Sequence, residues 1–262
     1  MPKPELVPLT GGYRRIPVLQ IGADVYCDSQ LIVRVLERLH PEPTLYPGAS
    51  EGTCHAWNLW ADRLLFLGVV SVVFAEIGAM VPREFIEDRQ KMMPGRDFGD
   101  LPRDAPHARE QVRALVGLLE TQMDDGRRFL LGSEPSLADA ACFHPLWFLR
   151  VAPEARSLLD AFPRVRDWCE RMEALGSGAG SPLAGEEALA IARASEPAAS
   201  SHASGPTVSI VPDDYGFDPV TGVLVDSSLH EVAVRRTDPD LGAIVVHFPR
   251  IGFRVMEARV GA

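Results

Sequence analysis

Cysteine is scarce in this sequence and is not arranged for cross-linking or for binding metal. The 262 residues include four cysteines, far apart and with no CxxC pair: Cys27, Cys54, Cys142 and Cys169. This spacing suits neither a zinc site nor a disulfide scaffold, so we expect free thiols in a reducing compartment. The seven histidines show no HExxH motif and no paired spacing, and we therefore predict no metal site.

Long apolar runs and clusters of positive charge are lacking as well. The longest apolar stretch, Leu64–Ala75, has twelve residues, whereas a membrane span needs about 20, so we predict a buried helix there. The first residues alternate proline with polar groups and lack the apolar core of a signal peptide. A net charge of -10, a pI near 5.2 and no run of Lys or Arg argue against a duplex-binding surface. We expect a cytoplasmic protein without nucleic-acid or membrane partners.

The sequence does contain a long helical middle part. Apolar residues spaced three and four apart predict helices over five stretches: Glu51–Ala79, a segment from Val112 that closes at Asp125-Gly126, Ser136–Leu149, Val165–Leu175 and Glu186–Ala194. Met92–Pro106 is rich in Pro, Gly, Asp and Arg and is predicted to be a loop. Ser195–Pro206 has the composition of a linker.

Beyond residue 206 the pattern changes to short β-type runs separated by turns. Five strands of a small antiparallel sheet are predicted: Thr207–Val211, Val223–Val225, Glu231–Arg235, Ala243–Phe248 and Phe253–Val255. The loop Asp213–Gly222 holds three carboxylates, as calcium sites do, but it lacks the spacing of an EF-hand, and we interpret it as a turn. His247, within the fourth strand, is predicted to be packed or at the surface.

The opening stretch, Leu9–Leu39, combines a hairpin with an amphipathic helix. Pro17 stands at the start of the first strand, where a proline lies at an edge or holds a cis bond. Asp28 and Ser29 stand just before the helix, whose first N–H groups carry the positive end of its dipole. Two interpretations are open: a corner that binds a carboxylate at Ser29 and an amine at Asp28, or a simple N-cap.

Three motifs in this order resemble the glutathione S-transferase family, including its bacterial members. Arg15-Ile-Pro-Val-Leu19, a hairpin and then Asp28-Ser29 are similar to the glutathione-binding half of that family's thioredoxin-like domain. Ser136-Leu-Ala-Asp139 resembles the N-capping box of its helical domain, and Phe162–Met172 resembles the helix near the end of that domain. The resemblance spans about Leu9–Leu175.

Together with the composition, the resemblance predicts an α+β fold in four parts. These are a truncated thioredoxin-like α/β half at residues 1–43, an all-α glutathione transferase C-terminal domain at 44–194, a linker at 195–206 and a small antiparallel β extension at 207–262. The resemblance also implies roles for single residues. Pro17 would be the cis-proline and Val18 the backbone partner of the cysteinyl unit of glutathione. Asp28 and Ser29 would hold the γ-glutamyl end, and Arg15 would lie near the glycine carboxylate.

One part of the family pattern is missing. The family begins with a strand–helix–strand unit of roughly 30 residues, and only eight residues precede Leu9. The thiol-activating Tyr, Ser or Cys of the family lies in that unit, so the catalytic residue is unknown. Tyr13, Tyr26 and Cys27 fall in the wrong element and are interpreted as structural. We expect an open sheet edge and an uncovered core face. Either Met1 is an internal methionine of a longer protein, which we favour, or the chain is a true short form.

The predicted function, in the intact form, is attack by a glutathione thiolate on an apolar electrophilic small molecule. Glutathione is the implied co-substrate, no metal is expected, and the resemblance implies a homodimer. Trp57 and Trp60 are expected in the core or along the groove for the apolar co-substrate. The alternative is a non-catalytic glutathione-binding or assembly module, which the β extension and the missing thiol-activating residue favour.

Overall fold

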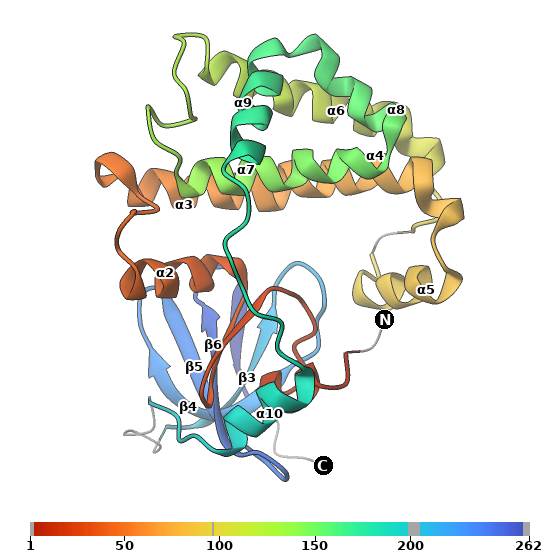
Figure 1. The fold of residues 1–262 in the computed structure, drawn as a ribbon. Coiled ribbons are helices and arrows are strands. Elements are labelled where there is room, and N and C mark those ends of the chain that lie inside the picture. Colours follow the sequence, from red (N-terminus) through yellow and green to blue (C-terminus); the bar gives the residue numbers. More distant parts are fainter. Residues whose placement is uncertain (1–2, 96, 199–204, 259–262) are drawn as a thin grey trace. The chain divides into compact units, whose positions relative to one another are not determined.

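The computed structural model describes residues 3–95, 97–198 and 205–258. The chain divides into two compact units, which we call the sheet unit and the helical unit (Figure 1). The sheet unit comprises residues 1–38, 91–94 and 180–262, and the helical unit comprises 39–90 and 95–179. These units differ from the predicted domains, because both ends of the chain belong to the sheet unit.

The sheet unit is built on one seven-stranded sheet. Its strands are β1 (Val18–Ile21), β2 (Asp24–Cys27), β3 (Thr207–Pro212), β4 (Val220–Ser227), β5 (Glu231–Asp238), β6 (Gly242–Pro249) and β7 (Phe253–Glu257). Their order in space is β1-β2-β6-β5-β4-β3-β7. β1 and β2 form the predicted hairpin, and the five C-terminal strands pair with one another in antiparallel fashion, as predicted.

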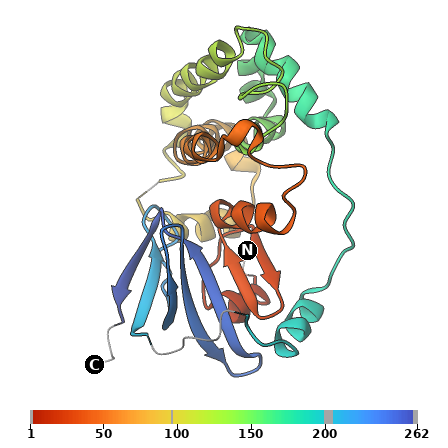
Figure 2. The same cartoon turned by 90° about the vertical axis from the view of Figure 1, so that its left-hand side faces the viewer.

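The hairpin and the C-terminal strands are joined by parallel pairing of β2 with β6. Asp24 lies opposite Val245 and Tyr26 opposite His247, and Figure 2 shows the red hairpin beside the blue strands. The β extension therefore continues the sheet of the hairpin. This shared sheet is the physical reason why the predicted boundaries at 43 and 207 do not separate compact units. Residues 199–204 of the predicted linker lie outside the described residues.

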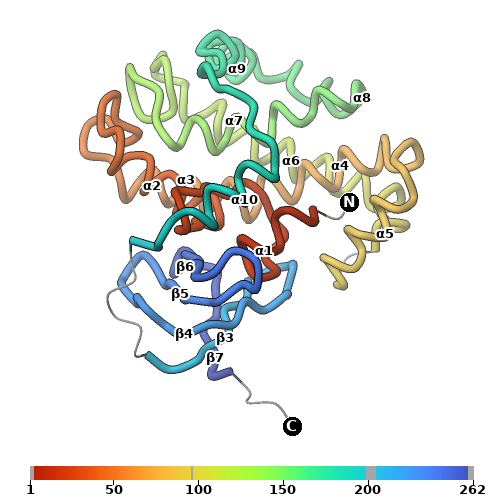
Figure 3. The backbone as a smooth tube through the Cα atoms, turned by 60° about the horizontal axis from the view of Figure 1, so that its bottom comes forward, coloured from red at the N-terminus to blue at the C-terminus, as the bar shows by residue number. Residues whose placement is uncertain are grey.

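One face of the sheet is covered by two short helices, α1 (Leu6–Thr10) and α10 (Gly185–Arg193). Leu9 of α1 and Ala192 of α10 belong to the same buried cluster as Val25 of β2, and Figure 3 shows the two helices close together. Burying these apolar side chains removes them from water and stabilises the unit. The expectation of an uncovered core face was therefore wrong. β1 is an edge strand of the sheet.

The other face carries α2 (Ser29–Leu39), the amphipathic helix predicted after Asp28-Ser29. Side chains alternate between faces along a strand, so Tyr26 points to this face while its neighbour Val25 joins the cluster on the other. The residues that pack with Tyr26 are Leu31, Ile32 and Val35. The small hairpin is thus held from both sides.

A buried polar cluster links β2, β6 and β5 on the α2 face. His247 lies between two carboxylates, with its Nε2 3.0 Å from Asp24 Oδ1 and its Nδ1 2.5 Å from Glu231 Oε1. Its ring stacks on Tyr26, with the centroids 4.3 Å apart. A neutral imidazole has only one N–H, so a ring that faces two carboxylates is best satisfied when protonated. Burial lowers the pKa of His247, but the hydrogen bonds to Asp24 and Glu231 outweigh it and raise the pKa above its ordinary value.

The helical unit contains four of the five predicted helices, and the fifth, Glu186–Ala194, is α10 of the sheet unit. Together with α5, which ends in the sheet unit, the helices of this part of the chain are α3 (Glu51–Trp60), α4 (Leu67–Ile77), α5 (Arg83–Met92), α6 (Leu101–Gln122), α7 (Leu137–Phe148), α8 (Pro153–Arg156) and α9 (Pro163–Ala174). The predicted loop Met92–Pro106 is wrong in its second half, because α6 begins at Leu101. Pro102 lies in the first turn, where a proline lacks only an N–H that has no helical partner in any case.

α3 and α4 belong to one helical run, Glu51–Met80, joined by a π-helical turn at Ala61–Phe66. The run has 30 residues, and its most apolar 18-residue window has a mean hydropathy of 1.9. Of that window, 28% is buried. A run of this length and composition is long and apolar enough to cross a membrane, but a core helix of a globular protein passes the same test. Leu65 and Val69 are buried but Leu64 is 53% exposed, so the helix that was predicted to be buried is buried only in part.

Replacing His247 with Gln should lower the free energy of unfolding most strongly at low pH. A group whose pKa is raised by folding contributes its full stability below its ordinary pKa, near 6.5 for histidine, and loses that contribution as the pH rises through the folded value. Because two buried carboxylates lose their partner, we expect a cost of about 3 kcal/mol at pH 6. The difference between wild type and His247→Gln should shrink as the pH is raised to 9.

The measurement is urea unfolding followed by far-UV circular dichroism from pH 6 to pH 9. The exposed His230, changed to Gln, serves as the matched control and should behave like wild type. A stability difference between wild type and His247→Gln that stays constant over this pH range would contradict the assigned protonation state.

Candidate functional site

The predicted binding corner lies where the hairpin meets α2. The Ile16–Pro17 peptide bond is cis, the conformation that the resemblance implies at Pro17, and Pro17 is exposed. Val18 opens β1 and pairs with Cys27 of β2. Because β1 is an edge strand, the sheet continues from Val18 on one side only. In the described part of the chain, no strand pairs with the other side of β1.

Asp28 forms the start of α2. Its φ of +74° lies in the left-handed region, which few residues other than glycine adopt. Its main-chain carbonyl accepts hydrogen bonds from the N–H groups of Leu31 and Ile32, and its Oδ1 accepts one from the N–H of Gln30 at 3.0 Å. Asp28 is thus the N-cap of the helix, which is the second of the two interpretations that the sequence left open.

Ser29 is the first residue of α2 and is exposed. Its hydroxyl makes no hydrogen bond within the described part of the chain, whereas the next three N–H groups of the helix are taken up by Asp28. A carboxylate at this point would meet a free hydroxyl donor and the positive end of the helix dipole. The corner can therefore hold an anion at Ser29 next to the carboxylate-bearing Asp28.

Arg15 is engaged by a loop from the C-terminal part of the chain. Its Nη2 donates to Asp214 Oδ1 and to the carbonyl of Tyr215, and its Nη1 lies 3.4 Å from Asp214 Oδ2. The guanidinium carbon lies 3.7 Å from the centroid of the Tyr215 ring. Burial lowers the pKa of Arg15, but the hydrogen bond to Asp214 and the neighbouring groups raise it on balance. The resemblance implies that Arg15 lies near the glycine carboxylate of glutathione. In the structure, its guanidinium already binds the carboxylate of Asp214.

The three residues considered as substitutes for the thiol activator are all buried. Tyr13 is 2% exposed, Tyr26 8% and Cys27 0%. Burial is the main cause that raises the pKa of each of them, and the nearby charge of Asp28 adds to it for Tyr13 and Cys27. None of the three is therefore an accessible acidic group that could stabilise a thiolate, and their structural interpretation stands.

The carboxylates of the Asp213–Gly222 loop face arginines. Asp214 pairs with Arg15, and Asp218 Oδ2 lies 4.0 Å from Arg14 Nε. Among the residues that the structure describes, no group of three or more His, Cys, Asp or Glu side chains is placed to hold a metal ion. This part of the chain therefore offers an ion-paired turn.

In the helical unit, Ser136 and Asp139 form the predicted capping box at the start of α7. Asp139 is fully buried. Its Oδ2 accepts from the N–H and the hydroxyl of Ser136 at 3.0 and 2.7 Å, and its Oδ1 accepts from the N–H of Leu130 at 2.7 Å and from Nε1 of Trp168 at 2.9 Å. The carboxylate therefore ties α7 to α9 and to the preceding turn, which is a structural role.

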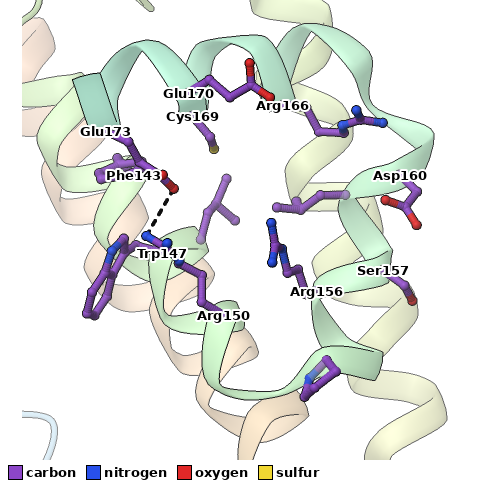
Figure 4. Close-up of a pocket in the computed structure, with 13 residues that line it drawn as sticks. Phe143, Trp147, Arg150, Arg156, Ser157, Asp160, Arg166, Cys169, Glu170 and Glu173 are labelled. Atoms are coloured by element: carbon purple, nitrogen blue, oxygen red, sulfur yellow. Dashed lines mark ion pairs between the residues drawn. The ribbon is translucent and has the colours of Figure 1, made fainter. Parts of the chain in front are cut away.

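The helical unit also contains a cavity of about 530 Å³ between α7 and α9 (Figure 4). Arg150 and Glu173 form an ion pair of 3.2 Å at its border, and Figure 4 shows Cys169 beside it. Burial, together with Glu173 and Glu170, raises the pKa of Cys169 to about 12. Cys169 therefore remains a thiol at neutral pH, and the cavity has no thiolate nucleophile.

The contacts that sequence reasoning missed are the long-range ones. Asp214 is 199 positions from Arg15, and Asp24 is 223 positions from His247. A turn rich in aspartate and a lone histidine in a strand carry no local pattern that identifies their partners. Pro17 and Val18 lie just before and at the start of β1, and Asp28 and Ser29 lie just before and at the start of α2; their binding roles stay predictions.

Comparison with known families gives two matches. Residues 1–44 match the glutathione S-transferase N-terminal domain, and residues 84–171 match the glutathione S-transferase C-terminal domain. No curated protein matches the chain.

Among solved structures, a GST-like protein from Pseudomonas syringae is 37% identical to this chain, with a TM-score of 0.79. The match covers 98% of this chain and 87% of that protein's chain. Poplar glutathione transferase F1 is 16% identical over 65% of this chain and 73% of its own, with a TM-score of 0.50. Its serine-to-cysteine mutant is 15% identical over 74% and 80%, also with a TM-score of 0.50. The likeness to the poplar enzymes shows the fold alone.

This chain belongs to the glutathione S-transferase family. The α+β fold class and the family resemblance predicted from the sequence are thereby confirmed. The family explains why a cis-proline, an edge strand and a capped helix occur together in the first 38 residues of the sheet unit.

Replacing Asp139 with Ala should destabilise the helical unit strongly. Four hydrogen bonds lose their acceptor in a buried place, and each unmet buried donor costs about 1–3 kcal/mol. We expect the free energy of unfolding to fall by at least about 3 kcal/mol. All four tryptophans lie in the helical unit, so urea unfolding followed by tryptophan fluorescence reports on it. Exposed Asp160, changed to Ala, is the control, and equal effects of the two changes would refute the structural role.

Proposed function

We propose that this protein binds glutathione at the corner formed by Val18, Asp28 and Ser29 and conjugates it to an apolar electrophilic small molecule. The observation that carries the proposal is the exposed Ser29 hydroxyl at the start of α2, next to Asp28 in its left-handed conformation. Family membership supports glutathione as the ligand. We also propose that the protein forms a homodimer and that it is located in the cytoplasm.

The chemistry of the corner fits the two ends of a γ-glutamyl group. Its carboxylate would accept from the Ser29 hydroxyl at the positive helix end, and its ammonium would lie near the carboxylate of Asp28. The cysteinyl unit would run along the edge of β1 and pair with the backbone at Val18, as extended peptides do at sheet edges. The thiol would then lie beside the hairpin.

In the proposed reaction the thiol of glutathione loses its proton to solvent and the sulfur forms a bond to an electrophilic carbon. The leaving group departs with the bonding electron pair, so the products are a thioether, the released anion and a proton. Within the helical unit, Trp57 and Trp60 are partly exposed and contact each other edge to face, with centroids 5.3 Å apart. An aromatic surface of this kind suits an apolar molecule.

A second candidate function is glutathione binding without catalysis. The burial and raised pKa of Tyr13 and Cys27 favour it, because neither side chain offers the sulfur an accessible acidic donor. The two functions differ in one assay. A transferase releases chloride from an activated aryl chloride at a rate that saturates with glutathione, whereas a binding module gives only the uncatalysed rate.

Replacing Ser29 with Ala should weaken glutathione binding by about tenfold, because a hydrogen bond to a charged carboxylate contributes roughly 1.5–3 kcal/mol. Isothermal titration calorimetry of the full chain with glutathione measures this. Ser227 is also exposed and lies in the same unit, so Ser227→Ala is the matched control and should bind like wild type. Equal affinities of the two variants would refute the Ser29 assignment, and no binding to wild type would refute the proposed function.

A further inference from the structure

We infer that the binding corner is selective for γ-glutamyl thiols whose carboxy end is uncharged or absent, and that Asp214 determines this selectivity. The inference rests on the proposed function. It concerns the far end of the ligand, where the glycine carboxylate of glutathione would lie and where the family resemblance places Arg15.

The guanidinium of Arg15 is occupied at both terminal nitrogens and on its face, and its Nε is buried without a hydrogen-bond partner among the described residues. Asp214 takes both terminal nitrogens, the Tyr215 carbonyl accepts from one of them, and the Tyr215 ring lies against the guanidinium. The side chains of Arg15 and Asp214 are only 10% and 12% exposed. A fork-like pair of this kind uses the two donors with which arginine usually binds a carboxylate. To bind these nitrogens, a ligand carboxylate would have to displace the carboxylate of Asp214, which is part of the chain itself.

The loop that carries Asp214 is fixed in this position by its main chain. The N–H of Asp213 donates to the carbonyl of Gly252 at 2.9 Å, and the N–H of Gly216 donates to the carbonyl of Met92 at 2.7 Å. Gly216 has φ +65°, and a Cβ at this position would lie 3.4 Å from Arg15 Nε. The glycine thus allows the left-handed turn, whereas a Cβ would make only an ordinary van der Waals contact with Arg15.

The charges around Arg15 also disfavour a further anion. Arg14, the neighbouring cation, has Asp218 of the same loop 4.0 Å away. Asp214 balances the charge of Arg15, and its carboxylate would lie beside any further anion that approached this guanidinium. A second carboxylate at this point would meet like charge, which raises its free energy. A thiol with a neutral carboxy end avoids this cost and keeps the γ-glutamyl contacts at Ser29.

The test compares two ligands that differ only at the glycine end. Glutathione and its glycine ethyl ester are titrated by calorimetry into the wild-type full chain at low ionic strength. We expect the ester to bind at least about fivefold more tightly than glutathione. A smaller difference, or tighter binding of glutathione, would overturn the inference and leave the proposed function standing. If neither ligand binds, the proposed function fails, and the inference fails with it.

The Asp214→Asn variant tests the residue assignment. It frees Arg15 of its charged partner, so glutathione should gain about tenfold over the ester relative to wild type. Asp226→Asn, in the same unit and with an exposed side chain, is the matched control and should leave the ratio unchanged. A ratio that Asp214→Asn does not move, or that both variants move equally, overturns the role of Asp214. Should Asp214→Asn not fold, the wild-type comparison of the two ligands decides the selectivity.

Discussion

The parallel pairing of β2 with β6 is the constraint on which the sheet unit depends. β1 and β2 have only four residues each, and an isolated hairpin is marginally stable in water. β6 pairs with the second strand of the hairpin, and the buried Asp24–His247–Glu231 cluster ties three strands together on one face. α2 begins directly after β2, so the C-terminal strands also determine where Asp28 and Ser29 stand.

The C-terminal strands therefore belong to the sheet unit in two ways. They complete the sheet that supports the corner, and their Asp213–Gly222 loop takes up the guanidinium of Arg15. An extension that looks separable in the sequence thus shapes the chemistry at the other end of the chain. The residue that binds the guanidinium of Arg15, Asp214, lies outside the matched family segments, which end at residue 171.

Sequence reasoning succeeded where structure is decided locally. The start of α2 follows from Asp28-Ser29 and an apolar period, and the role of Asp139 follows from its spacing to Ser136. It failed where a local rule had an exception, as at Pro102, which was read as part of a loop although a first helical turn accepts proline. It also could not supply the partners of His247 and Arg15, because strand pairing over some 200 positions leaves no trace in neighbouring residues.

The position of β6 also has a consequence for the order of events during protein synthesis. The ribosome releases β2 long before β6, and the two partners are separated by more than 200 residues, so the helical unit can fold while the hairpin still lacks its neighbour. Until the last strands emerge, one edge of β2 and the apolar side of Val25 stay open to other chains. A chain terminated early would keep that edge exposed and become a natural client for chaperones and proteases.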